Sequence, residues 1–578
     1  MRFLLFFVGC MYSFFTTVAQ VQEQGGAFPV QPQFAEGLPV RQVIIVMDKS
    51  GQKVLADSME TDAFYKAFQL KPGSLFRQAF ADKAIQTINA QSYIKSSNYQ
   101  LYNSSYSDPV IIVVNVVFLK QGEQKVVDGK KGLAVTGRDL PIIYQSSKAQ
   151  LSFILNGGVG LFNENNALFS KGAEFTKGNP IATMPAGKGV RFWGEAYLEP
   201  GVSVISQLGS SNTYVYGAGS VLISGRNSTD IYTEGSTIYA GFERLYGGIL
   251  FAKLGKNKQT NIDISAGRQF FQLNEGFLIS KFSGSANAGE RGSVYLNSRT
   301  AFQKTAMIKY HSKNWYGQAF FLEPQELFKE RQSNTNYTGA SLMFNNNKSI
   351  DAGVSYIQLT GGTSSYGTPF GSIAKKGMYI VNPKLWLQDI GSTGIFFKSE
   401  YAFQSHHKED MRSNAWYLGL GIKKNKWKYS PSLYYRYAFM KGDDSLTRKY
   451  ERFDPMLTGG LGNWVQGIDF RKINGSGNII SHRVEAKANF SKSFEMSVDY
   501  FLLRANTLSN IGSLSPIAKL NDESYGYEVT VSTRYFLSSH FMFLGVFSYA
   551  NPGDAISKAF STPVYPWTSI QGSLFMFF

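Results

Sequence analysis

Residues 568–578 read TSIQGSLFMFF and form a short strand pattern of apolar and aromatic side chains that ends on Phe578. Chain termini usually fray and are polar, so an apolar terminal strand predicts that this end is held within a sheet. A sheet that closes into a barrel needs such a strand to pair with its first one. The alternative is a buried edge strand of a soluble β-sandwich.

The pattern resembles the C-terminal signature of outer-membrane proteins, whose final aromatic residue is read by the assembly machinery. This resemblance implies that the strand ending at Phe578 contacts the barrel assembly machinery. Residues 1–19 combine one positive charge, an apolar run and a small-residue site at Ala19, which predicts a cleaved signal peptide. Cys10 follows Val8-Gly9, which gives a lipoprotein site as an alternative. Because Cys10 is the only cysteine, we expect no disulfide, thiolate metal site or cofactor in the mature protein.

The composition fits membrane-crossing strands better than membrane-crossing helices. Of the 578 residues, 17% are charged and 15% aromatic, and no window beyond the N-terminus offers the roughly 18 apolar residues that a membrane helix needs. The formal charge of +17 indicates either a basic surface facing anionic outer-membrane lipid or a lumen that favours anions. No nucleic-acid partner is expected, because no basic cluster with interleaved aromatic residues is present.

Residues 20–39 are rich in Gln, Gly and Pro and are predicted to be disordered. Residues 40–120 follow the order strand, helix, helix, strand, strand. An apolar stripe at i, i+4 spacing marks the second helix: Phe76, Phe80, Ala84 and Ile88. With Pro72-Gly73 before that helix, the order resembles a POTRA module, the small periplasmic domain that precedes some outer-membrane barrels. The resemblance implies a periplasmic partner bound through 40–120. The alternative is a generic α+β plug or docking domain, and 121–147 is interpreted as a linker.

From 148 to 578 the hydrophobic period is two. In 525–536 we expect the following residues to face lipid, with polar residues between them facing inward: Tyr525, Tyr527, Val529, Val531 and Tyr535. Short turns alternate with long loops, and counting back from the C-terminus gives about 18 strands. The sequence therefore predicts an all-β transmembrane barrel of about 18 antiparallel strands, preceded by a small α+β periplasmic POTRA-like domain. Long outer excursions at 161–189, 273–299 and 443–478 are expected to fold into the lumen as constrictions.

A second resemblance rests on short motifs in the barrel. The segment 431–444 reads PSLYYRYAFMKGDD, 450–455 reads YERFDP, and Gly267-Arg268-Gln269 and 549–553, YANPG, are further matches. Together they resemble the alginate export porins. That family implies an 18-stranded barrel in the bacterial outer membrane with an Arg-rich lumen that passes an anionic polysaccharide outward. The N-terminal module is a departure from the family.

Several basic residues are candidates for a pore lining. Strand alternation turns six of them inward: Arg191, Lys309, Lys398, Arg436, Lys487 and Arg534. Arg268 has the outward parity of its strand and is a candidate only through the family match, while Arg291 and Arg299 are constriction candidates in the 273–299 excursion. Glu195, Glu400, Glu485 and Glu528 also alternate inward, so the alternative is that the cations pair with carboxylates across strands.

These features predict a porin or export channel that passes an anionic polysaccharide or small anions by facilitated diffusion. The alternative is a POTRA-assisted translocator or assembly factor, although the only Arg-Gly dipeptide, Arg291-Gly292, lies early in the barrel for the loop motif of that class. A third possibility is a structural or adhesive barrel. No enzyme activity is expected, because no catalytic motif is present and His406-His407 with Glu409-Asp410 is interpreted as a solvated loop.

Overall fold

The computed structural model describes residues 28–30, 35–49, 52–55, 76–91, 93–103, 110–119, 142–146, 148–179, 182–255, 260–281, 292–326, 333–346, 349–368, 370–425, 427–444, 446–458, 464–491, 493–538 and 540–577. The predicted signal peptide, Arg291, Phe578 and the helix expected near 62–68 lie outside these residues.

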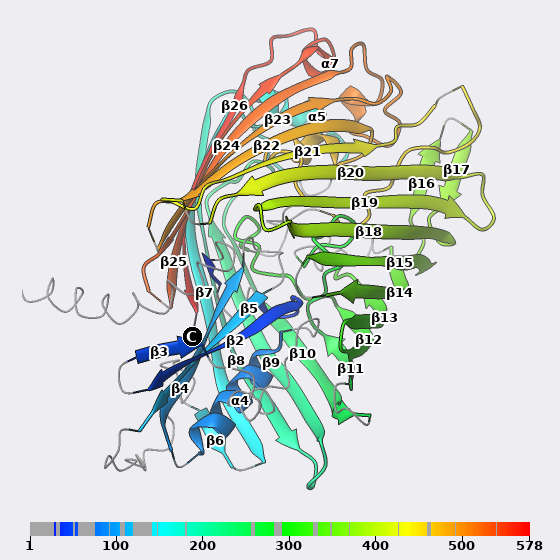
Figure 1. Ribbon diagram of the computed structural model, residues 1–578. Helices are drawn as coiled ribbons and strands as arrows, with labels where there is room; N and C mark the ends of the chain where they lie inside the picture. The colour runs from blue at the N-terminus through cyan, green and yellow to red at the C-terminus, as the bar shows by residue number, and fades with distance from the viewer. Residues whose placement is uncertain are drawn as a thin grey trace, which may run out of the picture.

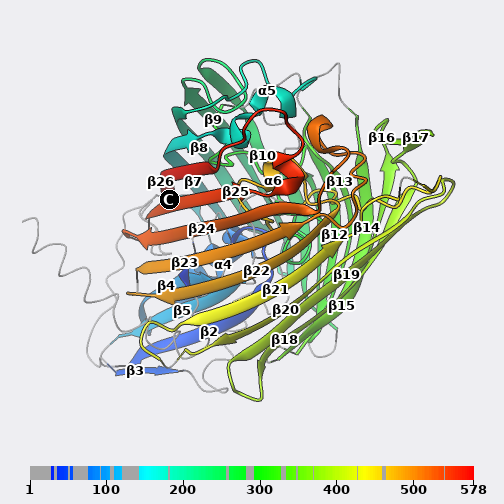
Figure 2. The same cartoon turned by 90° about the horizontal axis from the view of Figure 1, so that it is seen from above.

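In the described part of the chain, 18 strands form a closed antiparallel barrel (Figures 1 and 2). They are β7 (Ala149–Asn165), β8 (Val190–Gln207), β9 (Thr213–Asn227), β10 (Thr237–Leu254), β11 (Thr260–Arg268), β12 (Lys304–Ser312), β13 (Trp315–Glu323), β14 (Asn336–Asn345), β15 (Ile350–Gly361), β18 (Met378–Ile390), β19 (Ile395–His406), β20 (Arg412–Lys423), β21 (Ser432–Met440), β22 (Ile479–Asn489), β23 (Phe494–Arg504), β24 (Ser524–Phe536), β25 (Phe541–Pro552) and β26 (Trp567–Phe577). The predicted fold class is confirmed. Between β21 and β22, the described residues of the excursion add no further strand to the barrel.

The terminal strand closes the barrel as its sequence predicts. β26 pairs antiparallel with residues 156–165 of β7. The preceding residues of β7 pair instead with β6 (Ile142–Gln145), whose partners are Gln150, Leu151 and Ser152. Two short strands therefore follow one another along the same edge of β7.

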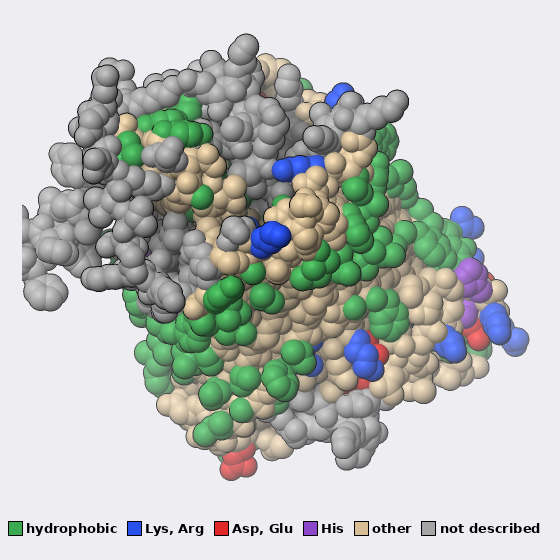
Figure 3. Space-filling view, turned by 90° about the horizontal axis from the view of Figure 1, so that it is seen from below, with side chains coloured by type: hydrophobic (Ala, Val, Ile, Leu, Met, Phe, Trp, Pro, Cys, Tyr) green, Lys and Arg blue, Asp and Glu red, His purple; other side chains and the backbone are tan. Residues whose placement is uncertain are grey.

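The barrel turns an apolar face outward. Large apolar side chains stand exposed on successive strands, among them Ile223, Leu245, Ile308, Leu342, Leu420, Leu433 and Ile570. Figure 3 shows hydrophobic side chains spread over the wall with few charged ones among them. A closed barrel satisfies its backbone hydrogen bonds internally, and an apolar exterior needs lipid to cover it, so the chain is an outer-membrane protein. No helix among the described residues has the length and apolar character to span a membrane.

One predicted lipid-facing residue is wrong. Tyr525 is fully buried among the inward residues, whereas Tyr527, Val529 and Val531 keep the outward parity. The register between β23 and β24 shifts at this point, and Gly526 adopts a φ of +128°. A bulge adds one residue to one strand and reverses the face of the residues beyond it, which places Tyr525 inside.

The N-terminal domain is an α+β unit of β1 (Phe28–Pro29), β2 (Val40–Lys49), β3 (Gln52–Leu55), α4 (Gln78–Asn89), β4 (Ile94–Asn103) and β5 (Val110–Phe118), with the sheet order β1-β4-β5-β2-β3. The predicted strands and second helix are confirmed, and Phe80, Ala84 and Ile88 lie on the buried face of α4. The helix begins later than predicted, at Gln78, so Phe76 is buried just before it and not within its stripe. The segment predicted to be disordered differs from the structure, since Phe28–Pro29 pairs with β4 and Ala35 and Leu38 are buried. These residues add a strand and core contacts that local composition does not reveal.

The outer loops carry short elements of their own. These are η1 (Ala167–Ser170), α5 (Gly172–Phe175), the hairpin β16 (Ser365–Thr368) and β17 (Gly371–Ala374), α6 (Arg471–Asn474), η4 (Ser515–Ile517) and α7 (Asp554–Ser557). In Figure 2 α6 lies within the ring of strands, while the β16–β17 hairpin projects from the rim.

Candidate functional site: the barrel interior

The inner wall between β22 and β24 carries a ladder of paired charges. Lys487 Nζ lies 2.7 Å from Glu495 Oε2, and Arg534 Nε donates to Glu495 Oε1 at 2.6 Å. Arg483 Nε donates to Asp499 Oδ1 at 2.6 Å. The antiparallel register places Glu495 opposite Arg534, so period-two alternation is enough to bring these groups together. Lys487 and Arg534 thus lie on the inner face, each in an ion pair.

Three other candidate cations bind groups of the outer loops. Lys398 pairs with Glu275 in the 269–303 loop. The Arg436 guanidinium donates to the Val465 carbonyl at 2.8 Å and lies 4.2 Å from the centre of the Trp464 ring. Arg191 donates to the carbonyls of Met184 at 2.7 Å and Pro185 at 2.9 Å. Their charges therefore bind loop groups that strand periodicity does not show.

Arg268 and Arg299 meet at one amide. Both donate to the side-chain oxygen of Gln325, Arg299 at 2.7 Å. Arg299 also pairs with Glu243 at 3.4 Å and lies 4.2 Å from the centre of the Tyr239 ring. The loop of Arg299 thus reaches the inner wall, as the constriction prediction requires.

Lys309 differs from the other candidates. It is buried on the inner face of β12, in register with Asp263 of β11, and among the described residues its ammonium has no hydrogen-bond partner. The structure therefore brings most of the predicted cations inside, but it pairs them with carboxylates, carbonyls and amides.

Inward glutamates anchor the loops through backbone N–H groups. Glu195 accepts from Tyr295 at 2.8 Å and Leu296 at 3.0 Å. Glu243 accepts from the N–H groups of Thr300 at 2.7 Å and Ala301 at 2.8 Å.

Glu528, on β24, accepts from the N–H groups of Asp469 at 3.0 Å and Phe470 at 3.1 Å. Charge-assisted bonds of this kind are roughly twice as strong as neutral ones. Sequence reasoning treated Glu195 and Glu528 as cross-strand partners and missed Glu243, although each lies inward on a wall that faces a long excursion.

The anchored loops form an aromatic core in the lumen. The ring of Phe277 lies 4.6 Å from that of Trp464, which in turn lies 4.5 Å from Tyr417 of the wall. Ile279 and Leu457 form an isolated parallel bridge between the 269–303 and 441–478 loops. The two excursions therefore meet inside the barrel, which confirms that they fold inward.

Asp454, in the Phe-Asp-Pro segment, forms a turn and an ion pair. Its Oδ1 accepts the Met456 N–H at 2.7 Å, the side-chain turn that the sequence indicates. Its Oδ2 lies 2.9 Å from Lys375 Nζ and also accepts from the Tyr366 hydroxyl. Burial opposes the charged form of this carboxyl, but the Lys375 ammonium and the Tyr366 hydroxyl outweigh burial and hold the pKa of Asp454 below its ordinary value.

Comparison with protein-family models and with curated protein sequences gives no match. Among solved structures, Pseudomonas aeruginosa OccK7 (OpdD) is 10% identical, with a TM-score of 0.43 over 74% of this chain and 98% of that chain. Pseudomonas aeruginosa OccK5 (OpdH) is 12% identical, with a TM-score of 0.44 over the same shares. A triple mutant of the Rhodopseudomonas blastica porin is 7% identical, with a TM-score of 0.32 over 74% of this chain and all of that one.

Proposed function

We propose that this chain is an outer-membrane channel that passes small polar solutes by facilitated diffusion. The observation that carries this proposal is the contrast between the apolar outer face and the ion-paired inner wall of β22 to β24. Charged groups in a dry interior cost free energy even when they are paired, so a wall lined with them suits contact with water. A barrel of 18 strands is wide enough to hold an aqueous path beside its loops.

The finer proposal concerns the solute. The resemblance to alginate export porins and the inward cations make anionic polysaccharide the first polymer to test. The ladder as a whole favours small solutes and weak charge selectivity instead, because its positive and negative charges balance and present little net field to a passing anion. Its cations are Arg483, Lys487 and Arg534, and its carboxylates are Glu485, Glu495 and Asp499. Polypeptide translocation and the absence of enzyme activity stay predictions.

The experiment is conductance of the purified full-length protein in planar bilayers, with solute uptake by proteoliposomes as a second readout. We expect discrete conductance steps, a reversal potential near zero in a salt gradient and uptake of small sugars. Uronate monomers and oligomers, added separately, distinguish a small-anion path from a polysaccharide path by which of them blocks current. A folded barrel that is silent in both assays, also when its N-terminal domain is unseated as described below, would refute the channel.

A further inference from the structure

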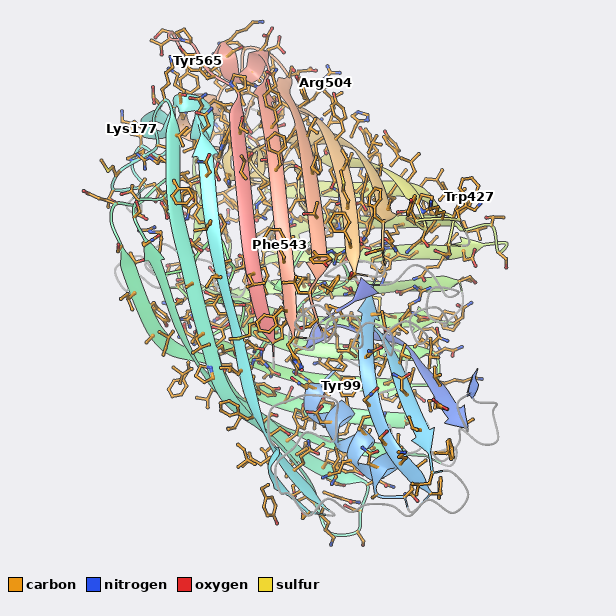
Figure 4. The ribbon with its side chains drawn as sticks, turned by 90° about the vertical axis from the view of Figure 1, so that its left-hand side faces the viewer. Tyr99, Lys177, Trp427, Arg504, Phe543 and Tyr565 are labelled. Carbon is orange, nitrogen blue, oxygen red and sulfur yellow. The ribbon has the colours of Figure 1, made fainter. Side chains whose placement is uncertain are left out.

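The N-terminal domain packs against the inner face of the barrel. Its apolar core continues into five inward side chains of β8 to β10: Ile205, Tyr214, Tyr216, Leu250 and Ala252. The ring of Phe80, on α4, meets that of Tyr216 edge-on at 4.9 Å. Figure 4 shows the strand that carries Tyr99 at the end of the molecule away from Lys177 and Tyr565, so the domain enters from the side of the short turns.

The barrel wall extends further where the N-terminal domain packs against it. β8 and β10 have 18 residues each, whereas β11, β12 and β13 have 9 each. In Figure 1 the lower parts of β8 to β10 lie alongside α4 and the sheet of the N-terminal domain. The long strands therefore provide an inner surface beyond the neighbouring short strands.

A polar cluster around Glu36 and Arg77 connects the N-terminal domain to the barrel wall. Arg77 and Glu36 are both buried, and Arg77 Nη1 lies 3.4 Å from Glu36 Oε1. Glu36 Oε2 accepts the N–H of Gln78 at 3.0 Å, so it also caps the start of α4. The Arg77 guanidinium lies 5.3 Å from the centre of the Tyr246 ring, and the Tyr246 hydroxyl donates to Glu36 at 3.3 Å. Tyr246 of the wall thus contacts both members of an ion pair that lies within the N-terminal domain.

The same cluster also reaches the loop that folds in from the opposite side. Arg77 Nη2 donates to Gln269 Oε1 at 3.0 Å, and Gln269 donates to Thr305 of β12 at 2.8 Å. A Cβ at Gly37 would lie 3.9 Å from the Cβ of Phe270. At this wall the N-terminal domain and the 269–303 loop therefore touch inside the barrel, with no layer between them.

We propose that the N-terminal domain is a plug, seated on the inner wall of β8 to β10 through Glu36 and Arg77, and that solute passes only when the plug leaves this seat. The proposal rests on the proposed channel function. Such a plug differs from a periplasmic module that lies free below the barrel, because Glu36 and Arg77 contact the barrel wall at Tyr246 and the 269–303 loop at Gln269. The seat combines apolar packing of Phe80 on Tyr216 with the polar contacts of Glu36 and Arg77.

The first test locks the plug in place. The Cβ separation at Gly37 and Phe270 falls within the roughly 3.5–4.5 Å of natural disulfides. A full-length chain with Gly37→Cys and Phe270→Cys, and with Cys10→Ser, is expected to form the cross-link on oxidation, detected by mass spectrometry. Conductance should fall to baseline and return on reduction. The two single cysteine variants control for the positive φ of Gly37 and for the loss of the Phe270 ring.

The second test removes the seat. Glu36→Ala with Arg77→Ala is expected to raise the open fraction roughly tenfold or more, because Tyr246 and Gln269 lose the buried charged partners that hold the domain at the wall. The matched control is Arg504→Ala with Glu523→Ala, an exposed ion pair at the opposite end of the barrel, where we expect no change.

The outcomes separate the plug from the channel. A cross-link that forms without changing conductance, or equal conductance in the wild type and the unseated variant, overturns the plug and leaves the channel. Failure of the cross-link in a folded double-cysteine variant overturns the seat. Silence of every variant in bilayers and liposomes overturns the channel and, with it, any gating role of the domain.

Discussion

Replacing Glu528 with Gln tests whether wall carboxylates hold the inward loops. Glu528 is fully buried, and its Oε2 accepts the N–H groups of Asp469 and Phe470 at 3.0 and 3.1 Å. Hydrogen bonds to charged groups contribute about 1.5–3 kcal/mol and neutral ones about 0.5–1.5 kcal/mol. Glutamine keeps the shape but not the charge, so the two bonds together should weaken by about 2–3 kcal/mol.

That loss raises the local opening equilibrium of the segment roughly 30- to 140-fold, since about 1.4 kcal/mol corresponds to a factor of ten. Amide hydrogen exchange at residues 468–470 measures the change directly, and conductance should rise in parallel as the loop leaves the lumen. The control is Glu523→Gln, whose carboxylate lies half exposed at the outer rim beside Arg504. Unchanged exchange at 468–470 in a folded Glu528→Gln barrel would refute the idea that this carboxylate anchors the loop.

Three further predictions concern other groups. Glu495→Gln leaves Lys487 and Arg534 without their shared carboxylate. The reversal potential in a salt gradient should therefore shift toward anion selectivity. An unchanged reversal potential would mean that the charge ladder lies away from the solute path. Because the pKa of Asp454 is held below its ordinary value, its ion pair with Lys375 stabilises the fold at pH values above about 3.9, and this stability is lost as pH falls through the lowered pKa. Amide hydrogen exchange in the β16–β17 hairpin of the wild type should therefore increase only in strong acid. In Asp454→Asn the same exchange should be increased already at neutral pH. Gly526→Ala forces a side chain into a φ of +128°, at a cost of about 1–3 kcal/mol, and should lower the thermal unfolding temperature, whereas Gly572→Ala, with no close neighbour beyond a flexible ring and no positive φ, should not.

Much of the fold was predictable because a barrel wall repeats one local rule. Period-two alternation and the contrast between short turns and long loops gave the strand number, the outward and inward faces and the inward excursions. Tyr525 shows the limit of that rule, since a bulge at Gly526 reverses the parity beyond it and leaves no signal except the glycine itself.

The candidate site was less predictable, because its partners come from distant segments. Alternation placed Lys487 and Arg534 inside, and their pairing with Glu495 follows from register. The partners of Lys398 and Arg436 lie in loops with no periodicity, so only the folded chain identifies them. The seat of the N-terminal domain was beyond reach for the same reason: the stripe of α4 predicts a buried face but not that Tyr216 would meet Phe80.

β26 and β6 pair with different parts of the same edge of β7, and this arrangement protects the barrel from pairing with other copies of itself. β26 covers only residues 156–165, and without β6 the preceding backbone groups would form an open template for a strand from another chain. The segment that leads into the barrel seals this gap with its own backbone. Deleting 142–145 should therefore produce oligomers joined strand to strand at the seam, while the remaining wall stays intact.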